Sequence, residues 1–541
     1  MLQEPLPTPS PQAGPTWRGA LALGAVALLM ALVWLRLGGA WSSDFAGDPD
    51  EAAHAVTSLM LRDYLAQGLG QAPMEFARSY YDHFPRVALG HYPPLYYLVQ
   101  APLLLWFNDA AALWLTQALL FAALALAIWR LAMACGLPSA LGWAVALSAL
   151  LLPITLKWAS MVMAELLLGV LVVWAVELWL QFMRRPSAGL ALCWGSVAAA
   201  AVLTKASGVM VAALPLLAPL ACGQWRLWRD WRWWLAALPA LVFALPWMLW
   251  SAGISSEGMT GMRLWDFAGQ AVAFYPQAGV RVWGWGLSLL ALGTWLSWGQ
   301  RAWQRTLGAT EATLAAAVLG ALAVLLLIPV GLTSRYLMPM TPLVVLLAAL
   351  GLWAILGRLA PALARRRTLV LLLMVWLTAR MFNPPLKRVE GFAAAVAKAE
   401  ALCGAKALPE RWLVSSDPRG EGAVIAAAAL AARDRVHGGR QVLRASQWLS
   451  SSDWMGRNYQ LKTADSGSVL ALLEKQGVAL VLLDDSQPEQ RQAPHHEMLS
   501  AAMESGAWQQ AAVVEVIRSS RQGEGSGRLR LFCRRGAIKN P

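Results

Sequence analysis

The chain has 541 residues, of which 58% are hydrophobic, 14% are charged and 30 are tryptophan. Soluble globular proteins carry about 25% charged residues. Together with a mean hydropathy of +0.49, this composition excludes a soluble protein and indicates an integral membrane protein. The net charge of +13 does not indicate a nucleic-acid partner, because lysine and arginine are scattered at the ends of apolar runs, where the positive-inside rule places them.

The N-terminus is a Pro-rich leader, residues 1–16, followed by an apolar run at Trp17–Leu37 that is too long for a signal-peptide core. We interpret the leader as cytoplasmic and the run as an uncleaved first helix. Apolar runs near membrane length continue to residue 382 and predict a polytopic α-helical membrane protein with about eleven to thirteen transmembrane helices. The predicted spans lie at 17–37, 111–134, 140–157, 161–182, 188–204, 209–222, 233–250, 280–299, 312–330, 338–357 and 368–382.

The run Leu95–Phe107 has about 13 residues, too few to cross a bilayer comfortably. If it stays re-entrant or interfacial, the arginine clusters near residues 184, 229, 301 and 366 all face one side, which is then the cytoplasm. If it crosses alone, every one of these clusters lands outside. We therefore expect the N-terminus inside and a first outer loop at 38–94. A compensating extra span elsewhere would give similar loop sides.

This sidedness, assigned from arginine and lysine alone, also gathers other polar residues on the outer face. Carboxylates are costly within the membrane, so a shared face for them favours one site near water. A single lysine or arginine at a span end is equally well explained by snorkelling to head groups. Asp44 and Asp63 are expected to be solvated loop charges. The outer residues are Asp48, Asp50, Glu51, Lys157, Glu165, Lys205, the loop Ser251–Gln277 and Ser334–Tyr336.

After Pro384–Pro385 the composition changes, and helix-like runs alternate with short β-type runs. This alternation predicts a C-terminal soluble α/β domain at 386–541, on the outer side of the membrane. No GxGxxG or P-loop motif follows its strands, so nucleotide binding is unsupported. Cys403 and Cys533 could form a disulfide only if this domain faces an oxidising compartment.

Four short motifs then occur in order on the outer face: Asp50-Glu51-Ala52, Tyr92-Pro93-Pro94-Leu95-Tyr96-Tyr97, Leu203-Thr204-Lys205 and Ser334-Arg335-Tyr336-Leu337-Met338-Pro339. Their order and sidedness resemble the C-type glycosyltransferases (GT-C fold), which include protein O-mannosyltransferases and lipid A aminoarabinose transferases. The resemblance covers residues 17–382 and implies a GT-C-like fold. The sequence departs from that family at His54, where an aromatic residue is usual, at His91, where lysine is common, and at Glu165, where aspartate is more frequent.

The resemblance also implies roles for individual residues. The catalytic group it implies is Asp50 as the base, with Glu51 beside it and Glu165 as a second acidic residue. Asp48, two residues before Asp50, is a rival for the base. Lys205 and Arg335 are implied to hold the lipid-linked phosphate. The expected substrate-binding residues are Asp48, His91, Tyr92, Lys205, Arg335 and Tyr336.

The expected function is that of an inverting glycosyltransferase in a bacterial-type cytoplasmic (inner) membrane. It would move a sugar from a polyprenyl-phosphate donor to an extracytoplasmic acceptor hydroxyl on a protein, glycolipid or glycan. The chemistry needs a carboxylate base for the acceptor proton and cations for the leaving phosphate. No cofactor is expected, and the spacing of His54, His83 and His91 is irregular for a metal site. A lipid-linked sugar transporter and a non-catalytic envelope assembly protein remain alternatives.

Overall fold

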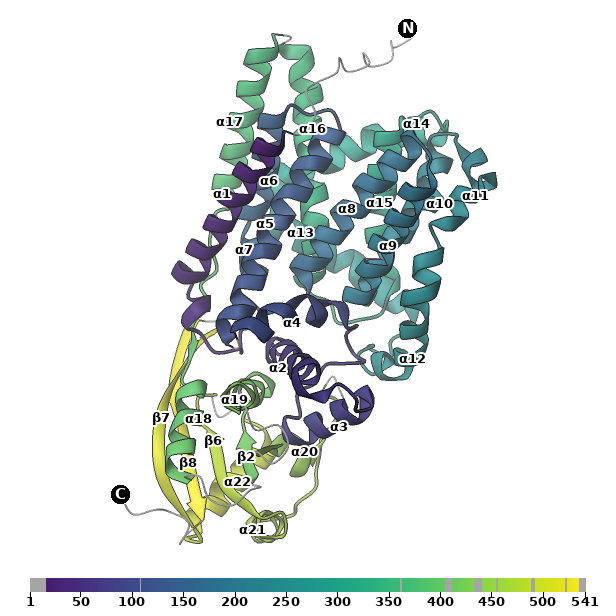
Figure 1. Cartoon of the computed structure of the whole chain (residues 1–541). Helices are drawn as coiled ribbons and strands as arrows, with labels where there is room; N and C mark the ends of the chain where they lie inside the picture. Colours follow the sequence, from purple (N-terminus) through teal and green to yellow (C-terminus); the bar gives the residue numbers. More distant parts are fainter. Residues whose placement is uncertain are drawn as a thin grey trace.

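A computed structural model describes residues 16–107, 109–360, 362–403, 411–432, 440–453, 456–487, 492–520 and 523–534 (Figure 1). A tall bundle of helices carries a smaller, sheet-containing domain at one end. The helices α2 (Glu51–Asp63), α3 (Pro73–His83) and α4 (Leu95–Phe107) lie between the two parts. The predicted leader lies outside the described residues except for Thr16, whose hydroxyl accepts a hydrogen bond from the backbone of Gly19 and caps α1 (Trp17–Leu37).

The bundle contains helices at nearly all of the predicted apolar runs. α1 begins at the end remote from the sheet domain and ends beside it, whereas α4 runs across that end of the bundle (Figure 1). The other helices are α5 (Ala110–Ala134), α6 (Ser139–Leu151), α7 (Pro153–Ala159), α8 (Glu165–Arg184), α9 (Ala188–Thr204), α10 (Ala213–Ala221), α11 (Trp231–Leu235), α12 (Leu245–Ser256), α13 (Leu264–Ser297), α14 (Gly299–Trp303), α15 (Ala309–Leu327), α16 (Thr341–Leu359) and α17 (Leu363–Met381).

Within the described residues, six helical segments are long and apolar enough to cross a membrane. They are Trp17–Leu37, Ala110–Ala134, Glu165–Arg184, Trp231–Ser256, Ala309–Leu327 and Ser334–Leu359. A seventh is added if α6 and α7 count as one span, although they are bent by 66° where Pro153 begins the second helix. The predicted polytopic helical membrane fold is confirmed, while the count of eleven to thirteen spans stays a prediction.

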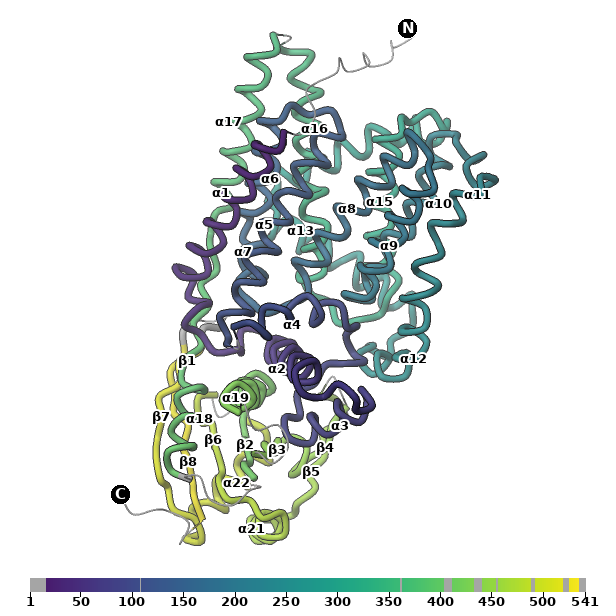
Figure 2. Tube along the Cα trace, in the orientation of Figure 1, coloured from purple at the N-terminus to yellow at the C-terminus, as the bar shows by residue number. Residues whose placement is uncertain are grey.

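The C-terminal domain is built on a six-stranded mixed sheet in the order β1-β7-β8-β6-β2-β3. The strands β2 (Arg411–Ser415), β3 (Gln441–Arg444) and β6 (Val478–Asp484) are parallel, while β1 (Val389–Glu390), β7 (Trp508–Ser520) and β8 (Gly523–Arg534) pair antiparallel. A separate pair, β4 (Ser450–Ser451) and β5 (Gln460–Leu461), lies near α3 (Figure 2). The helices are α18 (Phe392–Cys403), α19 (Pro418–Ala431), α20 (Ala445–Trp448), α21 (Ser466–Lys475) and α22 (Pro494–Glu504). The predicted α/β domain is confirmed.

The two faces of this sheet belong to different hydrophobic cores, because alternate residues of a strand point to opposite faces. Trp412, Val414 and Leu480 join a core that continues into the helical bundle, whereas Leu413 and Val481 join a smaller core of the domain alone. The sheet domain is therefore packed against the outer loop as part of one continuous interior.

The first outer loop is less solvated than its sequence predicts. Of the 13 residues of α2, 12 are buried, because α4 covers one side of this helix and α19 the other. The expectation that Asp44 and Asp63 are solvated loop charges is wrong. Asp63 is 4% exposed and its carboxylate lies 2.5 Å from Nε of Arg62, while Asp44 receives backbone N–H groups at the start of α18. The possible Cys403–Cys533 disulfide lies outside the described part of the structure, because the side chain of Cys403 is not described.

Candidate active site

Five charged residues from four separate parts of the chain meet at the end of the bundle that faces the sheet domain. Asp48 precedes α2 and Asp50 occupies the N-cap position of this helix without a side-chain capping hydrogen bond, while Glu165 is the first residue of α8. Lys205 directly follows α9, and Arg335 lies in the short 3₁₀ helix η6 (Ser334–Met340) that leads into α16. Each residue sits at a helix end, where the helices open toward the outer loop.

Arg335 is the centre of this cluster. Its Nη1 donates to Oδ2 of Asp50 at 2.8 Å and to Oδ1 of Asp48 at 3.3 Å. Its Nη2 donates to the hydroxyl of Tyr92 at 3.0 Å, and that hydroxyl in turn donates to Oδ2 of Asp50 at 2.8 Å. Its Nε lies 3.2 Å from Oε1 of Glu165. One guanidinium therefore bridges three carboxylates, which its planar fork of donors allows.

Glu165 and Lys205 form the deepest pair of the cluster. Nζ of Lys205 donates to Oε1 of Glu165 at 2.6 Å, and the two side chains are only 9% and 2% exposed, respectively. The second oxygen of Glu165, Oε2, is buried and has no hydrogen-bond partner among the described residues. An unpaired buried carboxylate oxygen is costly. The pair is thus a place where a further donor would be stabilised.

Aromatic rings line the cations. The ammonium of Lys205 lies 4.9 Å from the ring centre of Tyr336 and 5.8 Å from that of Tyr92. The guanidinium of Arg335 lies 5.7 Å from the ring of Tyr336 and 5.9 Å from that of Trp158. Ring faces within about 6 Å attract cations. Tyr92 and Tyr336, two of the expected substrate-binding residues, therefore lie in the cluster, and Trp158 is added to it.

The two aspartates differ in proton affinity. Burial alone would raise the pKa of Asp50, but Arg335 and the hydroxyl of Tyr92 hold it well below its usual range. Burial raises the pKa of Asp48 above its ordinary value, and the neighbouring charge of Asp50 adds to this, against the opposing effect of Arg335. A proton taken up by this pair is therefore held first by Asp48.

Two predicted site residues lie apart from the cluster. Glu51 contacts a different cation from Asp50: its Oε1 accepts a hydrogen bond from Nζ of Lys387 at 2.6 Å. His91 is partly buried, and its Nε2 lies 3.9 Å from a carboxylate oxygen of Glu257 in the α12–α13 connection. Burial lowers the pKa of His91, with Glu257 and Asp50 acting in the opposite direction. His91 therefore faces the α12–α13 connection, while Tyr92, its neighbour in sequence, belongs to the cluster.

Three residues with no expected role in binding or catalysis lie at the site or its border. His54 lies one turn after Asp50 on the same face of α2, and its Nδ1 is 3.0 Å from the hydroxyl of Tyr97. Burial lowers the pKa of His54 to about 4, so the ring is neutral at neutral pH. Residues four apart lie on the same face of a helix, so the spacing of His54 from Asp50 is a sequence signal that places both on one face. Trp158 and Lys387 carry no comparable local signal.

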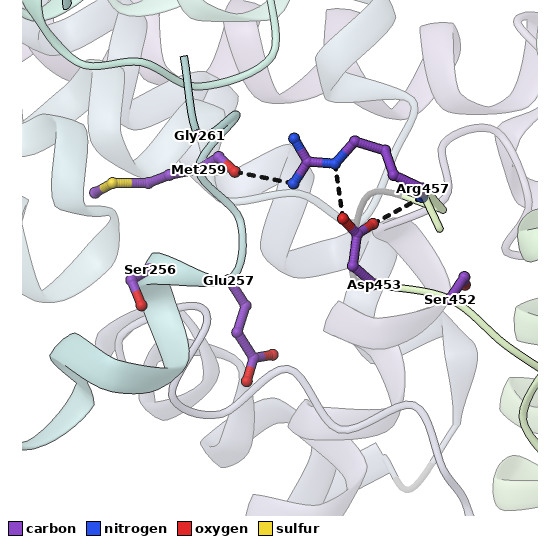
Figure 3. A pocket seen from close by; sticks show the side chains of 7 residues that line it. All are labelled: Ser256, Glu257, Met259, Gly261, Ser452, Asp453 and Arg457. Carbon is purple, nitrogen blue, oxygen red and sulfur yellow. Dashed lines mark hydrogen bonds and ion pairs between the residues drawn. The ribbon is translucent and has the colours of Figure 1, made fainter. Parts of the chain in front are cut away.

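A pocket of about 540 Å³ opens between the α12–α13 connection and the segment that joins β4 to β5 (Figure 3). The guanidinium of Arg457 donates to Asp453 at 2.7 Å and to the carbonyl oxygens of Met259 and Thr260, so it links the two walls. Glu257, the partner of His91, lies on the bundle side of this pocket (Figure 3). The pocket residues are Ser256, Glu257, Met259, Gly261, Ser452, Asp453 and Arg457.

The histidines and aspartates of the first outer loop contain the side-chain types that bind metal ions. Among the described residues, no group of three or more histidine, cysteine, aspartate or glutamate side chains is arranged to hold a metal ion. The carboxylates of the cluster instead face arginine and lysine.

The bundle of membrane-length helices, with a sheet domain packed on its outer loop, defines an integral membrane protein with the C-type glycosyltransferase fold. Its fold is similar to that of ArnT from Cupriavidus metallidurans in the apo state, with a TM-score of 0.55 over 96% of this chain and 99% of that one. It is also similar to ArnT from Cupriavidus metallidurans bound to undecaprenyl phosphate, with a TM-score of 0.52 over 97% of this chain and 100% of that one.

The sequence identity to both ArnT structures is 14%, and a similarity at this level establishes only the fold. Evidence for the reaction must come from the side chains of the cluster. A scan against protein-family models found no match, and a search of curated proteins found none either. The fold predicted from the ordered motifs is confirmed.

Proposed function

We propose that this chain is an inverting glycosyltransferase that moves a sugar from a polyprenyl-phosphate donor to an acceptor hydroxyl outside the cytoplasmic membrane. The observation that carries the proposal is a pair of buried cations, Lys205 and Arg335, held beside three carboxylates at the water-facing end of membrane helices. A lipid-linked phosphate reaches such a place from the bilayer while a soluble acceptor reaches it from outside. The ArnT structure bound to undecaprenyl phosphate supports a lipid donor of this class.

The proposed reaction is a single displacement. The acceptor oxygen attacks the anomeric carbon from the side opposite the phosphate, and a carboxylate takes the proton of the attacking hydroxyl. The bond from the anomeric carbon to the phosphate oxygen breaks, and the polyprenyl phosphate leaves with that electron pair. Lys205 and Arg335 stabilise the charge that develops on the phosphate. One base and one displacement give inversion at the anomeric carbon.

The electrostatics of the cluster suggest how donor binding activates the base. In the resting arrangement Arg335 holds the pKa of Asp50 low, which makes this carboxylate a weak base. When the guanidinium turns to the donor phosphate, Asp50 loses its principal counter-charge and gains proton affinity. Asp48 is the alternative base, because its pKa is already raised by burial.

The pocket of Figure 3 is the proposed entry for the acceptor. It is connected to the cluster through Glu257 and His91, whose neighbour Tyr92 contacts Asp50. Two carboxylates, Glu257 and Asp453, outweigh the single arginine in its wall. This charge disfavours a phosphorylated acceptor and favours an uncharged group that offers hydroxyls.

The orientation that this function requires places the outer loop, the pocket and the sheet domain outside. In a cysteine-free background, cysteines at Ser256 and Lys398 should react with an impermeant reagent added to spheroplasts. A cysteine at Trp303, in α14 at the opposite end of the bundle, should not (Figure 1). Protection of the first two, or labelling of the third, would reverse the proposed orientation.

The transporter alternative predicts charged residues deep within the spans. Glu177 lies in the interior of α8, where its charge is paired with Arg130 at 2.8 Å and its Oε1 also accepts a hydrogen bond from Gln181 at 2.9 Å. The test uses proteoliposomes with a fluorescent polyprenyl-phosphate sugar, with and without an envelope acceptor extract. A transferase releases polyprenyl phosphate only with acceptor and loses this release in Asp50→Asn, whereas Asp82→Asn, an exposed carboxylate of α3, leaves it intact. Acceptor-independent movement of the lipid that survives Asp50→Asn would favour transport.

A further inference from the structure

The segment that leads from α17 into the sheet domain is built into the first outer loop. The backbone N–H of Lys387 donates to the carbonyl of Gly38 at 2.8 Å, and its carbonyl accepts from the hydroxyl of Ser43 at 3.0 Å. The backbone N–H of Val389 donates to the same hydroxyl at 3.2 Å, and that of Asp44 donates to the carbonyl of Val389 at 2.7 Å. Residues 387–389 are therefore tied to residues 38–44 by four hydrogen bonds, two of which pass through the hydroxyl of Ser43.

Two further features show that this contact is close. Gly39 has a φ of 80°, and a Cβ there would lie 2.3 Å from the carbonyl oxygen of Lys387, so no other residue fits without displacing the segment. The carboxylate of Asp44 accepts backbone N–H groups of Phe392 at 2.8 Å and Ala393 at 3.3 Å. The outer loop thus caps the first helix of the sheet domain.

A buried ion pair completes the junction. Nζ of Lys387 donates to Oε1 of Glu51 at 2.6 Å, and the two side chains are 3% and 0% exposed, respectively. The ammonium also lies 4.7 Å from the ring centre of Trp114. The backbone N–H of Val162 donates to Oε1 of Glu51 at 3.1 Å, and that of Gly47 donates to Oε2 at 2.8 Å. Both oxygens of Glu51 are thereby engaged within the protein.

The sheet domain holds the same helix from the other side. A Cβ at Gly422 of α19 would lie 2.8 Å from Cβ of Ala52, and Arg86 donates to the carbonyl of Pro418 at the start of α19. Gln441 donates to the carbonyl of Asp82 at 2.8 Å. The first turn of α2, which follows Asp50, is therefore fixed between α19 and the linker, residues 382–391, that joins α17 to α18.

We propose that Glu51 and Lys387 are positioning residues, through which the linker and the sheet domain hold Asp50 in place. Glu51 is the next residue after Asp50, so a shift of the first turn of α2 moves the Asp50 carboxylate relative to Arg335. The sheet domain then takes part in ordering the site without contacting the substrate. This inference rests on the proposed function for its kinetic consequence, while the docking of the linker on α2 is independent of it.

The test compares hydrogen–deuterium exchange and kinetics of the full chain in lipid nanodiscs. Lys387→Met is expected to raise exchange of residues 384–393 and 44–58 at least tenfold. It is expected to lower kcat at least tenfold and change the donor KM less than threefold, since Lys205 and Arg335 keep their places. Lys398→Met, an exposed lysine of α18, makes the same substitution in the same domain and is expected to leave exchange and kcat unchanged.

Removing one partner leaves a buried unpaired charge, whereas removing both does not. The double variant Glu51→Gln/Lys387→Met is therefore expected to recover part of the protection and of the kcat that Lys387→Met loses. Ser43→Ala removes two hydrogen bonds of the junction without stranding a charge, so it should raise exchange of 384–393 even if Lys387→Met does not fold.

Three results would overturn the inference. Exchange in Lys387→Met and Ser43→Ala equal to that in Lys398→Met would show that the junction does not fix α2. Loss of turnover in Glu51→Gln with undisturbed exchange would make Glu51 a catalytic residue. Increased exchange in Lys387→Met with unchanged kcat would show that the linker docks on α2 but does not position Asp50 for the reaction. Failure of the proposed function gives a different pattern, in which the wild-type protein itself shows no acceptor-dependent release of polyprenyl phosphate while the exchange differences persist.

Discussion

Asp50 and Glu51 are adjacent carboxylates at the start of one helix, yet the fold gives them opposite environments. Asp50 faces Arg335 with 26% of its side chain exposed, while Glu51 faces Lys387 with 0% exposed. Arg335, the ion-pair partner of Asp50, also contacts Asp48, Glu165 and Tyr92. A substrate group can therefore replace one of these contacts without leaving Arg335 unpaired. The partners of Glu51 are an ammonium and two backbone N–H groups, which hold one arrangement. A two-residue acidic motif therefore divides into one carboxylate that shares its cation with other groups and one that is held in a single arrangement.

The largest expected effect separates these two members. Asp50→Asn should lower kcat/KM by about 10³-fold, because an amide cannot accept the acceptor proton, and should leave thermal stability near that of the wild type. Glu51→Gln should lower stability by about 3 kcal/mol, because Lys387 is left as a buried unpaired charge. Steady-state kinetics and thermal unfolding in detergent measure both. If Asp48→Asn abolishes turnover and Asp50→Asn does not, the base is Asp48.

The second comparison concerns Arg335 and Lys387, the cations that face Asp50 and Glu51, respectively. Arg335→Lys keeps the charge but loses the fork that contacts Asp50, Asp48 and Tyr92, so kcat/KM should fall by about 10- to 100-fold. Lys387→Arg replaces a group with one carboxylate partner and should change kcat/KM by a smaller factor. Donor titration in nanodiscs measures the accompanying loss of affinity. Equal effects of the two swaps would mean that the bidentate geometry of Arg335 has no special role.

A smaller effect is expected at the pocket. Arg457→Ala removes the link between the two pocket walls and should raise the acceptor KM by about tenfold, equivalent to about 1.4 kcal/mol, with donor affinity unchanged. Arg534→Ala provides the control, because its partner Glu474 lies 2.6 Å away on an exposed surface remote from the cluster. A change in donor affinity, or no change in either constant, would remove the pocket from the acceptor path.

The smallest effect is a pH dependence of the junction that holds Glu51. Burial raises the pKa of Asp44 from its ordinary value of 3.8 to about 6, with backbone N–H groups of Phe392 and Ala393 and the charge of Lys387 opposing it and Glu390 adding to it. A carboxyl with a raised pKa in the folded state binds a proton more tightly there than when undocked. Protection of residues 384–393 from exchange, corrected for the intrinsic rate, should therefore weaken as pH rises from about 4 to about 6 and then stay constant. Asp44→Asn should remove the dependence, and a slope of opposite sign would show that Asp44 is not the titrating group.

Much of the cluster follows from sequence because membrane physics restricts where charges stand. Glu165, Lys205 and Arg335 are conspicuous at the ends of apolar runs, and the positive-inside rule puts them on one face with Asp48 and Asp50. The structure brings all five together with Tyr92 and Tyr336. Their roles in the reaction stay predictions.

The positions of Glu51, His91 and Asp44 could not be read from the same pattern. Local spacing puts Asp50 and Glu51 about 100° apart around the helix, but it does not say which of them faces the cluster. That depends on Lys387, which is 336 residues away in sequence from Glu51 and carries no motif. Asp44 likewise has the composition of a loop charge until α18 places its first N–H groups beside it.

The membrane class, the α/β character of the C-terminal domain and the residues that gather on one face follow from apolar length, periodicity and charge placement, which are local properties of the chain. The expectation of a C-type fold rests instead on the resemblance of the ordered motifs to a known family. The three-dimensional structure is needed to show which carboxylate meets which cation, that α2 is buried between α4 and α19, and that the linker closes on the outer loop. Those outcomes depend on contacts between segments hundreds of residues apart, whose pairing is set by packing and by the cost of leaving a buried charge unpaired.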